Sequence, residues 1–294
     1  MVWVAGTPQT IQDRKGCREV ETFATRLLRS LDDRGPLCVG IDPHPSLLTG
    51  WGLTDTPAGL ERFCRTVIEA LAALVPVLKP QSAFFERFGS AGIAVLESTI
   101  RQSREAGALV LLDVKRGDIG STATAYADAY LGPDAPLRAD AVTVHPYLGF
   151  GALEPFLEAA RGHGGGVFVV ALSSNPEGRT VQQARGPDGR TVAQAVVDDV
   201  AGCNEGERPL GSIGVVVGAT AGGTGLDLSR LNGPVLAPGL GAQGATADDL
   251  TIVFRGLAGE LLPAYSREIL RHGPDVGALR EAANRSLAEC RKVR

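Results

Sequence analysis

Four ionisable residues stand at the ends of three apolar segments of the chain. They are Asp42, Lys79, Asp113 and Lys115. If the segments are parallel strands of a barrel, their carboxyl ends meet at the mouth where barrel enzymes carry out their chemistry. Ionisable groups gathered at that mouth are expected to act on a substrate. Asp118 follows just beyond the third segment and adds another carboxylate.

The residues before these charges follow the alternation of a strand. Val75 and Val77 precede Lys79 at spacings of two, and Leu111 precedes Asp113 in the same way. Side chains two apart share a face, so each ladder is apolar below and charged at the rim. A salt-bridge cluster that only closes the barrel is the alternative. Burying ions costs several kcal/mol per ion, which favours the functional interpretation.

A second signal indicates phosphate binding. The seventh apolar segment runs into PGLGAQGAT, residues 238–246, which contains Pro238 and Gln243. Glycines let backbone N–H groups approach an anion, and barrels commonly bind phosphate between the loops after strands seven and eight. The eighth segment ends at Ser266 and is followed by Arg267, whose guanidinium suits phosphate oxygens.

Other polar residues carry weaker signals. His145 ends the fourth segment without an obvious partner, so packing or hydrogen bonding is the expected role. His44 and the remaining histidines fall in loops or turns and are expected to be solvated. Ser173 and Ser174 end the fifth segment outside any nucleophile-elbow motif, which favours ligand contact over nucleophilic attack. No His/Asp/Glu spacing demands a metal, and none is expected.

Eight strand-like segments alternate with helical patterns along the chain. The strands are expected at 37–42, 75–79, 109–115, 141–145, 167–174, 213–218, 234–238 and 261–266. Helices are expected at 57–74, 91–106, 151–161, 191–203, 247–257 and 276–293, with start signals at Thr56, Ser90 and Thr246. An open doubly wound sheet shows the same alternation, but eight repeats favour a single-domain (β/α)8 TIM barrel.

Two regions depart from this repeat. Residues 1–20 look like a polar extension, so the barrel domain is assigned to 21–294. Residues 176–212 are longer than a βα loop needs and are expected to form an elaborated region after strand five. Long loops on the active face often close over substrate, but a surface elaboration without a role fits the sequence equally well.

Composition narrows the class of protein. The 294 residues carry a formal net charge of −4, which gives no footprint for nucleic acid. No segment reaches the roughly 18 apolar residues of a membrane span, and no signal peptide is evident. The five cysteines are odd in number and form no C-x-x-C pair. Reduced thiols in a cytoplasmic protein are therefore expected.

Residues 113–122, DVKRGDIGST, resemble the D-x-K-x-x-D-I-x-x-T signature of orotidine 5′-phosphate decarboxylases. The segments CVGIDPHPSLL, LKPQSAFFERFG, TVHPYLGFGAL, ALSSNPEG and APGLGAQGAT resemble the longer bacterial branch of that family. The likeness runs from about residue 21 to the C-terminus. It implies decarboxylation of orotidine 5′-phosphate to uridine 5′-phosphate without a metal or cofactor.

The resemblance also implies a role for each matching residue. Lys115 would protonate C6, Asp113 would face the substrate carboxylate, and Lys79 would complete the charged network. Other implied contacts are Asp42 and Lys79 with the ribose, Ser174 with the pyrimidine (Ser173 being the neighbouring candidate), Pro238 with the pocket wall, and Gln243, Ser266 and Arg267 with the phosphate. Asp118, Ile119 and Thr122 would reach the neighbouring site of a homodimer. The family pattern usually has glycine where this chain has Ser266.

Two relatives on the same scaffold are alternatives. 3-Keto-L-gulonate 6-phosphate decarboxylase and hexulose-6-phosphate synthase share a similar D-x-K-x-x-D strand but use Mg²⁺. They typically place an acidic ligand at the second strand, where this chain has Lys79. A catalytically silent nucleotide-binding protein is the other alternative. Binding alone requires neither Asp113 nor Lys115, which counts against it.

Overall fold

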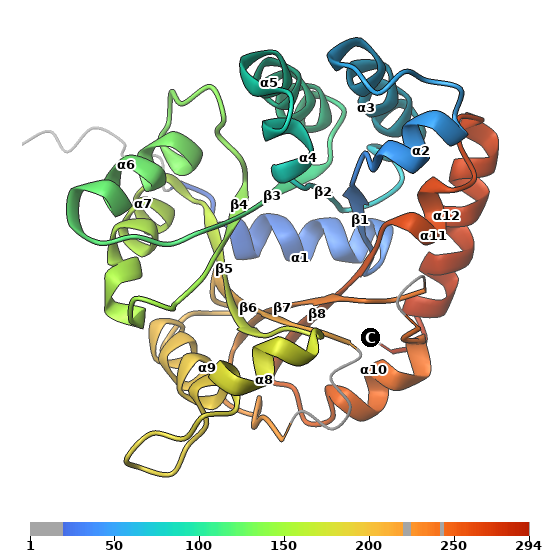
Figure 1. The fold of residues 1–294 in the computed structure, drawn as a ribbon. Helices are drawn as coiled ribbons and strands as arrows, with labels where there is room; N and C mark the ends of the chain where they lie inside the picture. The colour runs from blue at the N-terminus through green and yellow to red at the C-terminus, as the bar shows by residue number, and fades with distance from the viewer. Residues whose placement is uncertain (1–19, 220–224, 242–243, 294) are drawn as a thin grey trace, which may run out of the picture.

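Eight parallel strands close into a barrel in chain order in the computed structural model, which describes residues 20–219, 225–241 and 244–293. The (β/α)8 barrel expected from the sequence is confirmed (Figure 1). β8 pairs with β1 and completes the circle. The strands are β1 Cys38–Ile41, β2 Val77–Pro80, β3 Leu109–Arg116, β4 Ala141–Val144, β5 Gly166–Leu172, β6 Ile213–Val217, β7 Gly233–Pro238 and β8 Gly259–Tyr265.

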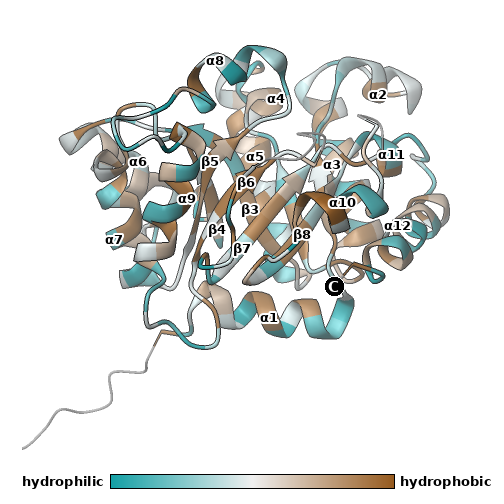
Figure 2. Ribbon diagram, turned by 90° about the horizontal axis from the view of Figure 1, so that it is seen from below, coloured by the Kyte–Doolittle hydropathy of each residue, from teal (hydrophilic) through white to brown (hydrophobic). Residues whose placement is uncertain are grey.

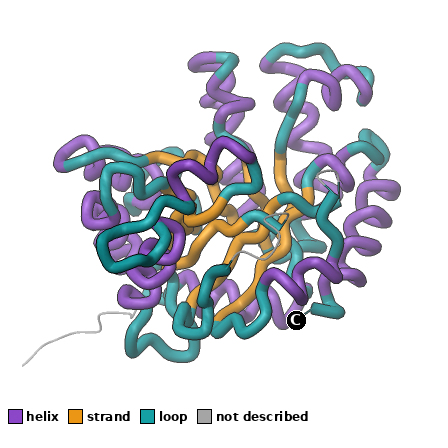
Figure 3. The backbone as a smooth tube through the Cα atoms, turned by 60° about the horizontal axis from the view of Figure 1, so that its bottom comes forward, coloured by secondary structure: helices purple, strands orange, loops and turns teal. Residues whose placement is uncertain are grey.

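Helices form the outer layer, and loops join them to the strands at both ends of the barrel (Figure 3). Among the described residues every helix is too short or too polar to traverse a lipid bilayer. The helices are α1 Phe23–Arg34, α2 Pro45–Gly50, α3 Pro57–Leu71, α4 Ala83–Glu86, α5 Gly89–Glu105, α6 Gly120–Leu131, α7 Glu154–His163, α8 Arg179–Gln182, α9 Val192–Cys203, α10 Ala247–Val253, α11 Arg267–Leu270 and α12 Val276–Cys290, with 3-10 turns Phe150–Leu153 and Pro176–Gly178.

The predicted helix starts are confirmed in two of three places. Thr56 caps α3 through its side chain, and Thr246 forms a capping box with Asp249 at the start of α10. The prediction at Ser90 is wrong, because α5 begins one residue earlier. The short α4 leads almost directly into α5, and the chain turns at Gly89 with φ +61°. The left-handed turn therefore starts this helix without a side-chain cap.

Helix α1 closes one end of the barrel and was not expected from the sequence patterns. It lies across the end opposite α2, α4 and α8 (Figure 2). Phe23, Leu27 and Leu31 pack against the inward-facing strand residues, and the Phe23 ring meets Phe168 edge-on at 5.9 Å. A Cβ at Gly166 would lie 2.4 Å from the Phe23 ring, so only glycine allows this approach. The interior below the mouth is thus sealed core. The proposed extension 1–20 falls almost wholly outside the described residues.

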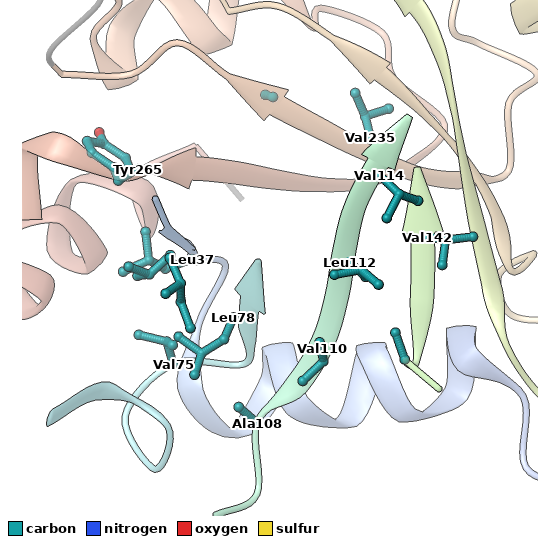
Figure 4. Packing of buried hydrophobic residues seen from close by; sticks show 14 of the residues in the cluster. Leu37, Val75, Leu78, Ala108, Val110, Leu112, Val114, Val142, Val235 and Tyr265 are labelled. Atoms are coloured by element: carbon teal, nitrogen blue, oxygen red, sulfur yellow. The ribbon is translucent and has the colours of Figure 1, made fainter. Parts of the chain in front are cut away.

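The buried apolar residues form two clusters on opposite faces of the strands. The smaller cluster fills the barrel and includes Cys38, Val77 and Leu111. The larger cluster lies between the barrel and its helices, where Val110, Leu112 and Val114 of β3 project outward (Figure 4). Val75 belongs to this outer cluster, so placing it on the Lys79 face was wrong. The strand begins only at Val77, after Pro76, and alternation does not extend before that point.

Candidate active site

Three charged side chains form a continuous array at the carboxyl ends of β2 and β3. The Asp113 carboxylate accepts a hydrogen bond from Lys79 Nζ at 3.0 Å through Oδ2. Its other oxygen, Oδ1, accepts one from Lys115 Nζ at 2.6 Å. Asp113 thus lies between two ammonium groups, as the ladders in the sequence indicated. One carboxylate held by two cations forms a rigid, alternating row of charges.

Burial and mutual attraction act in opposite directions on this array. Burial alone would lower the pKa of Lys79, but the Asp113 and Asp42 carboxylates outweigh it and raise that pKa. Burial alone would raise the pKa of Asp113, but Lys79 and Lys115 hold it well below its usual range. Lys79 and Asp113 are 7% exposed each, whereas the side chain of Lys115 is 48% exposed. The Lys115 ammonium is therefore the more accessible of the two.

The backbone of Lys115 is unusual. Its φ of +43° is in the left-handed region, which non-glycine residues rarely adopt. The pairing of β3 with β4 shifts register between Leu112 and Arg116, so simple alternation ends here. Such irregularities re-aim side chains next to active sites. The bulge sends the Lys115 ammonium back to Asp113 instead of along the strand.

Thr143 on β4 bonds both Asp113 and Lys115 at this bulge, and it was not identified from the sequence. Its hydroxyl donates to Asp113 Oδ1 at 2.8 Å and accepts from the Lys115 backbone N–H at 3.0 Å. The residue is 1% exposed, so water does not compete for either bond. The only sequence signal was a polar residue inside the apolar segment 141–145, two residues before His145.

Replacing Thr143 by valine should disturb the reaction more than the fold of the substrate pocket. The change keeps the shape but removes the donor to Asp113 and the acceptor for Lys115. Hydrogen bonds to charged groups contribute about 1.5–3 kcal/mol, so kcat should fall roughly 10- to 100-fold with a smaller change in KM. Thr143→Ser keeps the hydroxyl and should retain most activity. Equal kinetics in the two variants would show that the hydroxyl is dispensable.

A pocket of about 210 Å³ lies beside the array. Five residues predicted as site residues line it: Asp42, Lys79, Pro238, Ser266 and Arg267. They come from the ends of β1, β2, β7 and β8, so the mouth brings together segments far apart in the chain. Asp113 and Lys115 do not line this pocket but join it through Lys79.

The pocket wall contains polar atoms that lack partners among the described residues. Asp42 Oδ1 and Ser266 Oγ are buried without a hydrogen bond. Buried polar atoms normally have partners, so these two suit a ligand rich in hydroxyl or phosphate oxygens. Larger pockets elsewhere on the molecule contain none of the predicted site residues.

The expectation that His44 is solvated was wrong. His44 lines the pocket, is partly buried and packs its ring on Phe84 at 4.3 Å. Burial lowers its pKa and nearby Arg267 adds to this effect, while Asp42 opposes it. The neutral imidazole is therefore favoured. Its position two residues after Asp42, in the turn that follows β1, was the available signal.

The remaining predicted residues lie apart from the array in the single chain. Asp118 Oδ1 accepts from the backbone N–H of Ile119 at 2.8 Å, and its carboxylate forms no ion pair with any described residue. Ile119 is 62% exposed, and Thr122 is also exposed at the start of α6. Gln243 lies outside the described residues.

The two candidate serines after β5 differ in their contacts. The Ser173 hydroxyl donates to Asn175 Oδ1 at 2.6 Å and accepts from Gln182 Nε2 at 2.8 Å. Ser174 is exposed, and its hydroxyl forms no hydrogen bond with any residue that the structure describes. Ser174 is thus the serine available to a ligand.

Comparison with known proteins identifies the family. The model of the orotidine 5′-phosphate decarboxylase / HUMPS family matches residues 35–282, which include the array, the pocket and both candidate serines. The chain belongs to this family. The match confirms the likeness first noted in residues 113–122.

Individual members of the orotidine 5′-phosphate decarboxylase / HUMPS family are similar over nearly the whole chain. Orotidine 5′-phosphate decarboxylase from Salinispora arenicola is 66% identical over 92% of this chain and 98% of its own length. The Streptomyces coelicolor decarboxylase is 60% identical with the same coverage. A crystal structure from Streptomyces avermitilis ma-4680, provisionally named as this decarboxylase, is 59% identical with a TM-score of 0.91 and covers 94% of this chain and 96% of that chain.

Proposed function

We propose that this chain decarboxylates orotidine 5′-phosphate to uridine 5′-phosphate and CO₂ in pyrimidine biosynthesis, without a cofactor. The observation that carries the proposal is the Asp113 carboxylate bonded by both Lys79 and Lys115 at the barrel mouth. The decarboxylases at 60–66% identity support the same substrate. The four described cysteines are free, which fits the cytoplasmic location expected from the sequence.

The reaction requires an electron pair to be left on C6 of the pyrimidine. The bond between C6 and the carboxylate carbon breaks, CO₂ leaves, and the pair remains at C6. The fixed Lys115 ammonium stabilises that charge and transfers its proton to C6. Lysine then regains a proton from solvent. Asp113 lies beside this ammonium and holds it in place, and its negative charge opposes that of the substrate carboxylate.

The remaining site residues contact three parts of the substrate: the ribose, the pyrimidine and the phosphate. Asp42 and Lys79 hydrogen-bond the ribose hydroxyls, which gives the buried Asp42 Oδ1 a partner. Ser174 contacts the pyrimidine. Pro238 lines the pocket, while Gln243, Arg267 and the backbone or hydroxyl of Ser266 bind the phosphate. The phosphate contacts are remote from C6, but their binding energy can be used to lower the barrier at the reacting centre.

Arg267→Ala should weaken recognition of the phosphate. A charge-assisted hydrogen bond of about 1.5–3 kcal/mol corresponds to a roughly 10- to 100-fold rise in KM. Affinity for uridine, which lacks the phosphate, should not change, and titration calorimetry with uridine and uridine 5′-phosphate measures both. Arg271, directly after the same helix, pairs with Glu268 and provides the control, Arg271→Ala. Equal loss for both ligands would contradict the assignment.

A second copy of the chain completes the site in this proposal. Asp118, Ile119 and Thr122 reach the neighbouring active site of a homodimer, where Asp118 extends the alternating charges. Ile119, the residue after Asp118, is exposed, and Tyr147 and Leu148 are further exposed apolar residues, 75% and 50% accessible. Such apolar exposure suits a protein interface.

The Mg²⁺-dependent sugar phosphate enzymes are the competing function. The family that matches this chain also includes the HUMPS group, so the match alone does not separate the two. The Lys79 ammonium does, because it is 3.0 Å from Asp113 and occupies one oxygen of that carboxylate. A divalent cation at the same carboxylate would be repelled by two ammonium groups.

An absorbance assay with orotidine 5′-phosphate, excess chelator and no added cofactor tests the proposal. Steady formation of uridine 5′-phosphate is expected. No conversion, with Mg²⁺ then supporting turnover of a sugar phosphate, would overturn the substrate while leaving the barrel and its family unchanged.

A further inference from the structure

Helix α8, in the elaborated region after β5, is bonded to the end of that strand through the side-chain amide of Gln182. Gln182, the last residue of α8, accepts from the Ser173 backbone N–H at 3.0 Å through Oε1. Its Nε2 donates to the Ser173 hydroxyl at 2.8 Å. Both halves of the amide thus bind the same residue. Two hydrogen bonds from one planar group fix orientation as well as distance.

Further contacts close this attachment into a small polar network. The Ser173 hydroxyl donates to Asn175 Oδ1 at 2.6 Å, and Asn175 Nδ2 donates to Glu177 Oε2 at 2.9 Å. Gly178 packs so closely that an added Cβ would lie 2.8 Å from Ser173 Oγ and 3.0 Å from the Gln182 amide. The turn from β5 into α8 is therefore built around Ser173.

The consequence concerns the adjacent residue. Ser174 follows Ser173 directly, is exposed at the barrel mouth and keeps a hydroxyl without a partner among the described residues. A backbone that is fixed at Ser173 also restricts where the Ser174 hydroxyl can lie. A recognition group held in place before binding loses less entropy when the ligand arrives.

We propose that Gln182 is a positioning residue for pyrimidine recognition, acting through Ser173 on Ser174. The inference rests on the proposed function, in which Ser174 contacts the base. It assigns a role to the elaborated region that the sequence left open. In this proposal α8 fixes the position of Ser174, which contacts the base. The phosphate and ribose are bound by residues at the ends of other strands.

A ligand series separates this role from a purely structural one. Gln182→Ala should weaken uridine 5′-phosphate about tenfold, the effect of one typical hydrogen bond, and leave ribose 5-phosphate unchanged. The neighbouring Gln183 is exposed, so Gln183→Ala is the matched control and should change neither affinity. Equal weakening of both ligands by Gln182→Ala, or no weakening of either, would overturn the proposal.

Two further variants test the path through the serines. Ser174→Ala should weaken uridine 5′-phosphate binding to a similar extent. The double variant should lose less binding free energy than the sum of the two single losses, because both changes act on the same contact between Ser174 and the base. Additive losses would show that Gln182 acts elsewhere. Gln182→Glu keeps the acceptor for the Ser173 N–H. Its affinity for uridine 5′-phosphate should lie between those of wild type and Gln182→Ala. This variant tests the proposal if the alanine variant folds poorly.

Turnover by the wild-type protein and nucleotide binding by Gln182→Ala separate an error in the role of Gln182 from an error in the proposed function. If wild-type protein decarboxylates orotidine 5′-phosphate and Gln182→Ala binds uridine 5′-phosphate normally, only the role of Gln182 is wrong. If wild-type protein shows no turnover, the proposed function is wrong. The ligand series then still reports whether Gln182 governs base recognition.

Discussion

Lys115→Ala is expected to lower kcat at least about 10³-fold, because it removes both the proton donor and the cation next to C6. Uridine 5′-phosphate should still bind within about tenfold of wild type, since the pocket residues Asp42, Lys79 and Arg267 are unchanged. Single-turnover kinetics and titration calorimetry measure the two effects separately.

Lys292→Ala is a matched control for this prediction. Lys292 is an exposed lysine near the C-terminus, far along the chain from the array. Its replacement should leave kcat unchanged. Full activity in Lys115→Ala would sink the mechanism, and loss of nucleotide binding in that variant would show that the lysine mainly organises the pocket.

Subunit mixing is expected to produce a large recovery of activity. Asp118→Ala and Lys115→Ala homodimers should each be nearly inactive. In a heterodimer of the two, one site receives both native residues and the other receives neither. Random pairing by two-fold symmetry makes half of the dimers mixed, so about a quarter of wild-type activity should return.

The control mixture joins Asp113→Ala with Lys115→Ala. Asp113 and Lys115 bond each other within one chain, so every site of this heterodimer lacks one of them. No recovery is expected. Absence of recovery in a verified Asp118→Ala and Lys115→Ala heterodimer would mean that each site is built from a single chain.

Both predictions depend on the electrostatics of one buried carboxylate. Asp113 is 7% exposed and stays ionised because Lys79 and Lys115 lower its pKa. The contribution of Asp113 to stability depends on pH because its pKa differs between the folded and unfolded states. A carboxyl with a depressed folded pKa contributes stability above its unfolded pKa, and that contribution is lost as pH falls toward the folded value. At neutral pH Asp113 is therefore ionised and contributes its whole stabilisation.

The sequence by itself determined the barrel and most of the charged rim. Eight apolar segments with intervening helical patterns predicted the strand order, and the ends of three of them placed Asp42, Lys79 and Asp113 together. The placement of Asp42, Lys79 and Asp113 was predictable because the carboxyl ends of parallel barrel strands meet at one mouth. Strand alternation was a weaker guide, since it fails at Val75 and ends at Lys115.

Some elements could have been found in the sequence but were missed. The apolar residues of α1 recur at helical spacing, with Thr22 as a side-chain cap. The helix was overlooked because it follows a polar N-terminal stretch. Its role in closing the barrel depends on Phe23 meeting Phe168, residues 145 positions apart (168 − 23), which no local pattern reveals.

Only the tertiary structure decided how the site is held. The register shift at the end of β3, the positive φ of Lys115 and the two bonds of Thr143 arise from pairing between strands. The attachment of Gln182 to Ser173 likewise depends on how α8 folds back on β5. Composition and spacing fix which groups can react. Their exact positions follow from long-range packing, because hydrogen bonds and strand register join residues that the sequence keeps apart.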